Sequence, residues 1–69
     1  MKLSARNILK GTVLKVVPGS VNTEVAICVA DGIEIVAMVS KTSVDQLGLK
    51  PGDAAYAIIK ASNVMLGVD

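Results

Sequence analysis

Histidine, tryptophan and phenylalanine are absent from this chain of 69 residues, and cysteine and tyrosine occur once each, as Cys28 and Tyr56. A single cysteine excludes an intrachain disulfide, and without histidine the chain lacks the usual ligands of a Cys/His zinc site. An unpaired cysteine is typical of a protein from a reducing compartment. A domain this small is marginally stable alone. Because neither a disulfide nor a zinc site can stabilise it, we expect association with further copies of the chain.

An excess of charge of either sign is missing as well. Seven Lys or Arg residues oppose six Asp or Glu residues, for a net charge of +1, which excludes the broad basic surface of a non-specific nucleic-acid binder. The longest apolar runs have six residues, such as residues 25–30, whereas a transmembrane helix needs about 20. Lys2, Arg6 and Lys10 interrupt the segment in which a signal peptide would carry an apolar stretch of about 7–15 residues. We therefore expect no membrane partner and a cytoplasmic location.

The residues that usually perform catalysis are also missing or unsupported. General acid–base chemistry at neutral pH relies most often on histidine, which the chain lacks. Asp31, Asp45 and Asp53 fall at expected turn or helix-start positions, where local hydrogen bonding accounts for them. Cys28 lies in an apolar strand pattern with no base to activate its thiol. We therefore expect a protein that binds a ligand and is not an enzyme, with no cofactor and no bound metal cation.

Apolar residues make up 52% of the chain, the mean hydropathy is +0.62, and most of these residues fall in strand-like patterns. Alternating or β-branched runs predict strands over residues 9–17, 21–30, 33–40 and 54–60, with a short fifth strand over residues 64–67. Thr42 resembles the first residue of a capping box and Gly48 a helix-ending glycine, so a short helix is expected over residues 43–47.

Three strands, a short helix and two further strands follow the element order of the OB-fold. We therefore predict one all-β domain over residues 1–69, an OB-fold-like, five-stranded Greek-key barrel with one short helix between strands 3 and 4. An SH3-like barrel is the main alternative, and the helix disfavours it. Gly11, inside the first strand, predicts a bulge or a close backbone approach. Asp31-Gly32 predicts a two-residue hairpin turn with positive φ at both positions.

The second and third predicted strands are apolar on both faces. Their outward positions carry Ala26, Cys28, Ala30, Val36 and Met38. In a lone barrel the outward positions of antiparallel strands should be polar. Scattered exposed apolar residues are normal, but this set is contiguous across two paired strands, so we interpret it as a subunit interface.

Two short segments carry groups that bind anions. Ser4-Ala5-Arg6-Asn7 places a hydroxyl, a guanidinium and an amide ahead of the first strand, and Lys60-Ala61-Ser62-Asn63 places an ammonium and a hydroxyl at the end of the fourth. A tetrahedral dianion needs several short donors and one or two cations around it, and Ser40 adds a hydroxyl at the end of the third strand. Each residue alone is equally explained as a solvated charge or a capping hydroxyl. Our interpretation is that the two segments meet across subunits around a tetrahedral oxyanion.

The alternative function is that of an OB-fold module that binds single-stranded nucleic acid. Such modules stack bases on aromatic side chains along a basic groove. Tyr56 is the one aromatic residue, and the net charge is only +1. The composition therefore favours a small anion over nucleic acid.

Several segments read together are more specific than any one alone. They are Ser4-Ala5-Arg6-Asn7 with Leu9-Lys10-Gly11, Val36-Ala37-Met38-Val39-Ser40, Leu47-Gly48-Leu49 with Pro51-Gly52, and Ile59-Lys60-Ala61. This combination spans essentially the whole chain and resembles the molbindins, small cytoplasmic molybdate-binding proteins built from a Mop domain. The resemblance implies an OB-like barrel, a homohexamer arranged as a trimer of dimers, and molybdate or tungstate bound between subunits for storage or homeostasis.

The resemblance also implies which residues hold the oxyanion. One class of site uses Ser4, Ala5 and Arg6 of one subunit together with Ser40, Lys60 and Ala61 of a neighbour, and Ser62 adds a further donor. A second class lies near the threefold axis and draws on the turn into the second strand, at Gly19, Ser20, Val21 and Asn22. Pro18 removes one backbone donor beside this turn.

Overall fold

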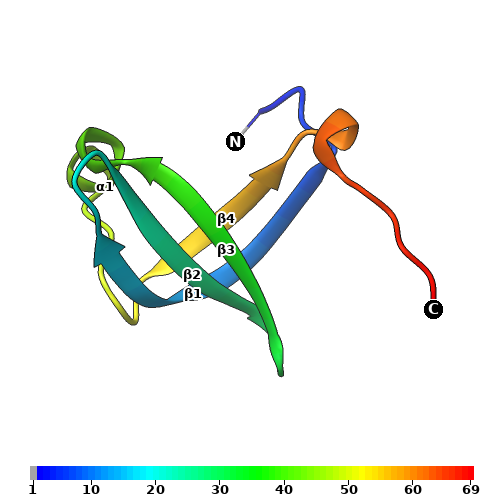
Figure 1. The fold of residues 1–69 in the computed structure, drawn as a ribbon, viewed down its shortest axis with the longest axis horizontal. Coiled ribbons are helices and arrows are strands. Elements are labelled where there is room, and N and C mark those ends of the chain that lie inside the picture. Colours follow the sequence, from blue (N-terminus) through cyan, green and yellow to red (C-terminus); the bar gives the residue numbers. More distant parts are fainter. Residues whose placement is uncertain (1) are drawn as a thin grey trace.

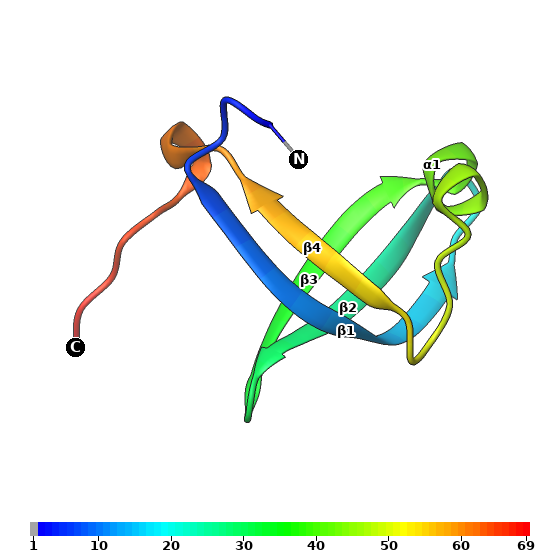
Figure 2. The ribbon, with the colours of Figure 1, turned by 180° about the vertical axis from the view of Figure 1, so that it is seen from behind.

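The computed structural model describes residues 2–69, which form four strands, one short α-helix and a 3-10 turn (Figures 1 and 2). In chain order the elements are β1 (Asn7–Pro18), β2 (Asn22–Ala30), β3 (Ile33–Ser40), α1 (Lys41–Leu47), β4 (Ala54–Ile59) and η1 (Ala61–Asn63). The strands form one antiparallel sheet in the order β3-β2-β1-β4. The all-β class and the helix between the third and fourth strands are as predicted.

β1 is long because it is shared between two partner strands. Its first half, from Asn7 to Thr12, pairs with β4, and its second half, from Thr12 to Pro18, pairs with β2. An irregularity between Val13 and Lys15 follows the change of partner, and such bulges increase the local twist. The sheet therefore curls into a half-barrel whose edge strands are β3 and β4 (Figure 1).

The close backbone approach predicted at Gly11 is confirmed. A Cβ atom at this position would lie 2.5 Å from the carbonyl oxygen of Cys28 and 3.2 Å from the Cγ1 atom of Val29. Gly11 directly precedes Thr12, the residue at which β1 changes partner. The absence of a side chain here lets β2 pass close to β1 beside the point where β1 changes partner.

The core is small and is built from alternating strand positions, as a half-buried sheet requires. Its buried cluster consists of Val13, Val25, Ile27 and Val44. Partly buried residues of the other elements pack against this cluster, namely Val16, Val29, Ile35, Val39, Leu49, Ala55 and Ala57. Val44 is the one member from α1, so the helix contributes a single side chain to the core among the described residues.

The apolar outward face is present but narrower than the sequence indicates. Val36 and Met38 are 58% and 65% exposed, as expected for an uncovered apolar face. Ala26 is only 1% exposed, although the strand alternation places it on the outward side. Its register neighbours are Lys15 on β1 and Val36 on β3, and a small side chain between two longer ones is readily covered.

Helix α1 begins two residues earlier than predicted. Ser40, not Thr42, is the N-cap, because the Ser40 Oγ accepts a hydrogen bond of 3.1 Å from the Ser43 N–H. The predicted end is confirmed, since Gly48 has φ 64° and its N–H donates to the Val44 carbonyl at 2.9 Å. The N-cap residue is thus also the last residue of β3, so α1 follows β3 directly, without a connecting loop.

The hairpin between β2 and β3 turns at Asp31-Gly32, but not with the predicted conformation. Gly32 has φ 76°, and no non-glycine residue among residues 2–69 has a positive φ. The prediction of positive φ at Asp31 was therefore wrong. An irregularity in the pairing between Cys28 and Ala30 supplies twist that the turn would otherwise have to provide.

The fifth strand predicted over residues 64–67 does not form in the single chain. After η1, residues 64–69 have no regular structure and extend away from the sheet (Figures 1 and 2). A strand requires a partner edge, and the segment meets none in this arrangement. The OB-like barrel is consequently incomplete between β3 and β4.

Candidate functional site

The two anion-binding segments lie side by side at one end of the sheet. Ser4, Ala5 and Arg6 immediately precede β1, while Lys60 immediately follows β4. Because β1 and β4 are antiparallel, Asn7 is paired with Ile59, and this pairing brings both segments to the same edge. The Asn7 Nδ2 atom also donates a hydrogen bond of 3.1 Å to the Ile59 carbonyl. The sequence was interpreted as joining these segments across subunits, whereas the pairing already joins them within one chain.

The second of these segments is shaped by the turn η1. The N–H of Asn63 donates to the Lys60 carbonyl at 2.9 Å, and the N–H of Val64 donates to the Ala61 carbonyl at 3.3 Å. A turn of this type gives no acceptor to its first N–H groups, here those of Ala61 and Ser62. Backbone donors thus accompany the ammonium group at this end of the sheet.

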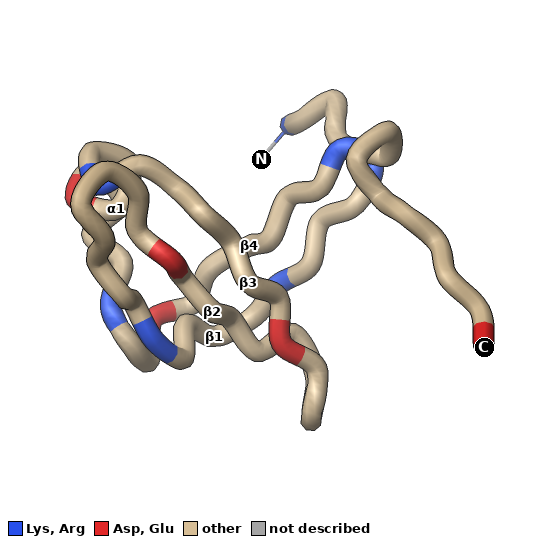
Figure 3. The backbone as a smooth tube through the Cα atoms, viewed as in Figure 1, with Lys and Arg blue, Asp and Glu red and all other residues tan. Residues whose placement is uncertain are grey.

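The charge at this end is positive. Figure 3 shows two basic positions close together where β1 begins and β4 ends, and the nearest acidic position along the C-terminal segment is at its tip. Ser4, Arg6, Lys60 and Ser62 are all exposed, and Ala5 is half-buried. The hydroxyl, guanidinium and ammonium groups are therefore accessible to an anion from solvent. We call Ser4–Arg6 with Lys60–Ser62 the terminal cluster.

Ser40 does not belong to the terminal cluster of its own chain. It is paired with Asn22 and lies at the far end of β1, next to the turn that follows Pro18. β1 has twelve residues, and an extended strand rises about 3.3 Å per residue. The longest dimension of the molecule is 34 Å. Ser40 and Lys60 of one chain therefore lie near opposite ends of β1, whereas the sequence interpretation drew both residues from one neighbouring subunit.

The hydroxyl of Ser40 is also engaged within the chain. Besides accepting from the Ser43 N–H, it donates to the Ser43 Oγ at 2.8 Å. Ser43 was not singled out from the sequence, although its spacing of three residues from Ser40 is a capping spacing. Because the Ser40 hydroxyl donates its proton to Ser43, the Ser43 hydroxyl proton is the one that this pair can still donate to another group.

The predicted second site surrounds the turn between β1 and β2. Gly19, Ser20, Val21 and Asn22 are all exposed. The N–H of Gly19 donates to the Asn22 carbonyl at 2.8 Å, and a Cβ at position 19 would lie 2.5 Å from that oxygen. The turn is therefore tight, and the Asn22–Ser40 pairing places the Ser40 hydroxyl beside it. The structure thus groups Ser40 with the second predicted site.

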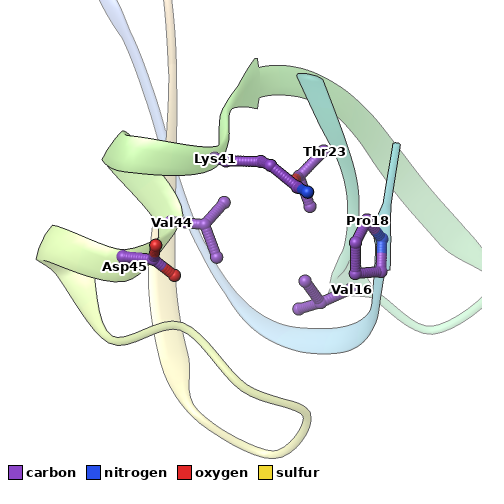
Figure 4. Close-up of a pocket in the computed structure, with 6 residues that line it drawn as sticks. All are labelled: Val16, Pro18, Thr23, Lys41, Val44 and Asp45. Carbon is purple, nitrogen blue, oxygen red and sulfur yellow. The ribbon is translucent and has the colours of Figure 1, made fainter. Parts of the chain in front are cut away.

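A shallow cavity of about 460 Å³ lies next to this turn and is shown in Figure 4. Its lining residues are Val16, Pro18, Thr23, Lys41, Val44 and Asp45. In Figure 4 Lys41 extends from the start of α1 towards Thr23, and Val16 and Val44 point into the cavity. Lys41 was not singled out from the sequence, although its place directly after Ser40 is the signal that would have identified it.

Other kinds of site find no support in the described part of the chain. Residues 2–69 contain no group of three or more His, Cys, Asp or Glu side chains placed to hold a metal ion. None of the helices in these residues is long and apolar enough to cross a membrane. The Cys28 thiol donates to the Ala30 carbonyl at 3.0 Å, an arrangement that does not activate it as a nucleophile.

Comparison with known proteins identifies the family. A model described as the TOBE domain matches residues 3–66. Over all 69 residues the chain is 49% identical to a protein of Haemophilus influenzae described as a probable molybdenum-pterin-binding protein, with both chains fully covered. The chain belongs to the molbindin, or Mop, family.

Solved molbindin structures share this fold. The cytoplasmic molybdate-binding protein ModG, in a form with molybdate bound, matches with a TM-score of 0.94 and 56% identity. That match covers all of this chain and 49% of ModG, so the chain spans about half of the ModG length. MopII from Clostridium pasteurianum matches with a TM-score of 0.90 and 39% identity, covering 97% of this chain and all of MopII. The OB-like Mop fold predicted from the sequence is thereby confirmed.

Proposed function

We propose that this protein binds molybdate and tungstate and stores or buffers these oxyanions in the cytoplasm, without catalysing a reaction and without a cofactor. The observation that carries the proposal is the terminal cluster, which places Arg6, Lys60 and the Ser4 hydroxyl at one exposed end of the sheet. The 56% identity to ModG with molybdate bound supports the choice of ion.

The energetics of such a cluster suit an oxyanion. A hydrogen bond to a charged group contributes about 1.5–3 kcal/mol, and micromolar affinity corresponds to about 8 kcal/mol. Roughly three to five charge-assisted bonds therefore suffice. Ser4, Arg6, Lys60, Ser62 and the backbone N–H of Ala61 supply that number of donors at one end of the sheet.

We propose that the complete site lies between copies in a homohexamer built as a trimer of dimers. Ser40 reaches the terminal cluster only if a copy other than the one that supplies Lys60 contributes it. The turn at Gly19–Asn22, with Lys41 beside it, is the proposed second oxyanion site, which also needs donors from further copies because its own N–H of Gly19 is engaged.

The first test is isothermal titration with molybdate, tungstate, sulfate and phosphate. We expect heat from the first two ions at micromolar protein. Lys60→Ala should weaken molybdate binding by at least tenfold, because it removes one charge-assisted bond. Lys15→Ala, which removes the same charge from the middle of β1, is the matched control and should leave the affinity unchanged. Equal effects of the two variants would contradict the site, as would oligonucleotide binding in place of oxyanion binding.

The second test asks whether Ser40 and Lys60 come from different copies. Chains carrying Ser40→Ala and chains carrying Lys60→Ala are unfolded together and refolded as mixed assemblies. If one site combines the two residues from different copies, random mixing restores roughly a quarter of the sites. If both residues came from one copy, no site would be restored. Mixing Lys60→Ala with Thr42→Ala chains controls for sites that do not need Ser40.

A further inference from the structure

One side-chain hydrogen bond joins the two segments of the terminal cluster. The Asn7 Nδ2 atom, at the start of β1, donates over 3.1 Å to the carbonyl of Ile59, at the end of β4. Its two residues are 52 positions apart in the chain, whereas the other side-chain hydrogen bonds within residues 2–69 join residues two or three positions apart. This bond therefore fixes two distant segments relative to each other, and the others shape local turns.

The two residues of this bond are the immediate chain neighbours of the two cations. Asn7 directly follows Arg6, and Ile59 directly precedes Lys60. Asn7 and Ile59 also form the last pair of the β1–β4 ladder, and the ends of such ladders open most readily. Figure 3 shows the two basic positions close together here, and like charges at short range repel. Repulsion between the cations therefore favours opening of the ladder at the pair that the Asn7 side chain joins.

Lys60 is the residue whose backbone this bond helps to fix. The peptide group between Ile59 and Lys60 is planar, so holding the Ile59 carbonyl also sets the direction of the Lys60 N–H. On the other side, the Lys60 carbonyl accepts a hydrogen bond of 2.9 Å from the Asn63 N–H. Between these two bonds Lys60 has an extended backbone, with φ −64° and ψ 134°. The two bonds together set the direction in which the ammonium group leaves the sheet.

We propose that Asn7 is a positioning residue of the oxyanion site, and that its amide holds Arg6 and Lys60 side by side before the ion arrives. The inference rests on the proposed function, since it concerns the same site. Groups that are already in place bind more tightly, because the binding free energy is not spent on ordering them. An amide suits this position because it donates to the Ile59 carbonyl without adding a negative charge near the ion.

The test titrates molybdate into Asn7→Ala and into a matched control, Asp53→Ala. The Asp53 Oδ2 atom accepts from the Lys50 N–H at 3.2 Å, so the control also removes one hydrogen bond between a side chain and the backbone. Asp53 precedes β4 and Lys60 follows it, a separation of about 20 Å along the strand, at which salt of about 0.15 M screens the change of charge. We expect about tenfold weaker binding in Asn7→Ala, equivalent to one misplaced charge-assisted bond, and unchanged affinity in the control.

Two further substitutions separate the hydrogen bond from the packing of the Asn7 side chain. Asn7→Leu keeps the branched shape but has no donor, whereas Asn7→His changes the shape and again offers an N–H at the δ position. At pH 8 the imidazole is neutral, so it adds no charge to the cluster. We expect Asn7→His to recover most of the affinity and Asn7→Leu to bind as weakly as Asn7→Ala. The reverse order would show a packing role and would overturn the proposal.

Amide hydrogen exchange in the absence of any ion gives a readout that does not depend on binding. We expect the Asn63 amide to exchange faster in Asn7→Ala, because the Lys60 carbonyl to which it donates is no longer held, and at an unchanged rate in Asp53→Ala. If the unmodified chain binds molybdate and Asn7→Ala binds it equally well, the positioning role is overturned and the proposed function stands. If the unmodified chain gives no heat with molybdate, both are overturned.

Discussion

Replacing Gly11 with alanine tests the claim that a close backbone approach shapes the half-barrel. The added Cβ would lie 2.5 Å from the Cys28 carbonyl oxygen, whereas ordinary contacts begin at 3.4 Å. β1 or β2 must therefore move by about 0.9 Å to relieve the overlap. The obstructing atom belongs to the backbone of a strand paired on both sides, so no side-chain rotation can accommodate the change.

The expected loss of stability follows from two opposing terms. Overpacking in a well-packed region costs about 1–3 kcal/mol, and the upper half of that range applies because a backbone must shift. Replacing glycine by alanine also restricts the unfolded chain, which stabilises the fold by about 0.4–1 kcal/mol. The net destabilisation is about 2 kcal/mol. In a domain of 60–100 residues each kcal/mol lowers Tm by roughly 4–8 °C, so a fall of about 8–16 °C is expected.

The assay is thermal unfolding followed by circular dichroism at one fixed chain concentration, since association makes Tm concentration-dependent. Gly67→Ala is the matched control, because an added Cβ there meets nothing within 4 Å and the φ of Gly67 is not positive. We expect the control to change Tm by less than about 2 °C, as surface substitutions usually do. A Gly11→Ala variant as stable as the control would refute the reasoning.

Two further substitutions test the support that α1 gives to the core. Val44→Ala removes the one buried side chain of α1 and should destabilise the fold by about 2 kcal/mol in urea unfolding, from about 0.8 kcal/mol per methylene plus a cavity; an exposed-site change such as Gln46→Ala should have little effect. Ser40→Ala removes the N-cap hydrogen bond and should cost about 1 kcal/mol, with faster hydrogen exchange at the Ser43 amide. Unchanged exchange there would contradict the capping role.

The elements that the sequence predicted well are those set by local patterns. The alternation along β2 and β3 gave the outward positions Ala26, Cys28 and Val36, and the residues that alternate with them, Val25, Ile27 and Ile35, lie in or against the core. Gly48 ends α1 because an αL conformation is readily available to glycine. Gly11 marked a close approach for the same reason, the lack of a Cβ. In each case the type of residue at the position is enough to predict the local structure, because few other structures would account for it.

The predictions that failed depend on partners outside the local segment. Residues 64–67 have a strand-like composition, but a strand also needs an edge to pair with, and the single chain directs the segment away from its own. Thr42 and Ser40 are both acceptable capping residues, and only the point where β3 stops pairing with β2 selects Ser40. The φ of Asp31 depends on a bulge two residues away that the sequence does not mark.

The placement of the anion-binding residues links the function to the assembly. β1 pairs with β4 at one end and with β2 at the other, so the strand that brings the terminal segments together also places Lys60 and Ser40 near its opposite ends. In the proposed homohexamer, another copy brings its Ser40 end to the terminal cluster. A substitution that weakens association should therefore weaken oxyanion binding even when it touches no ligand residue.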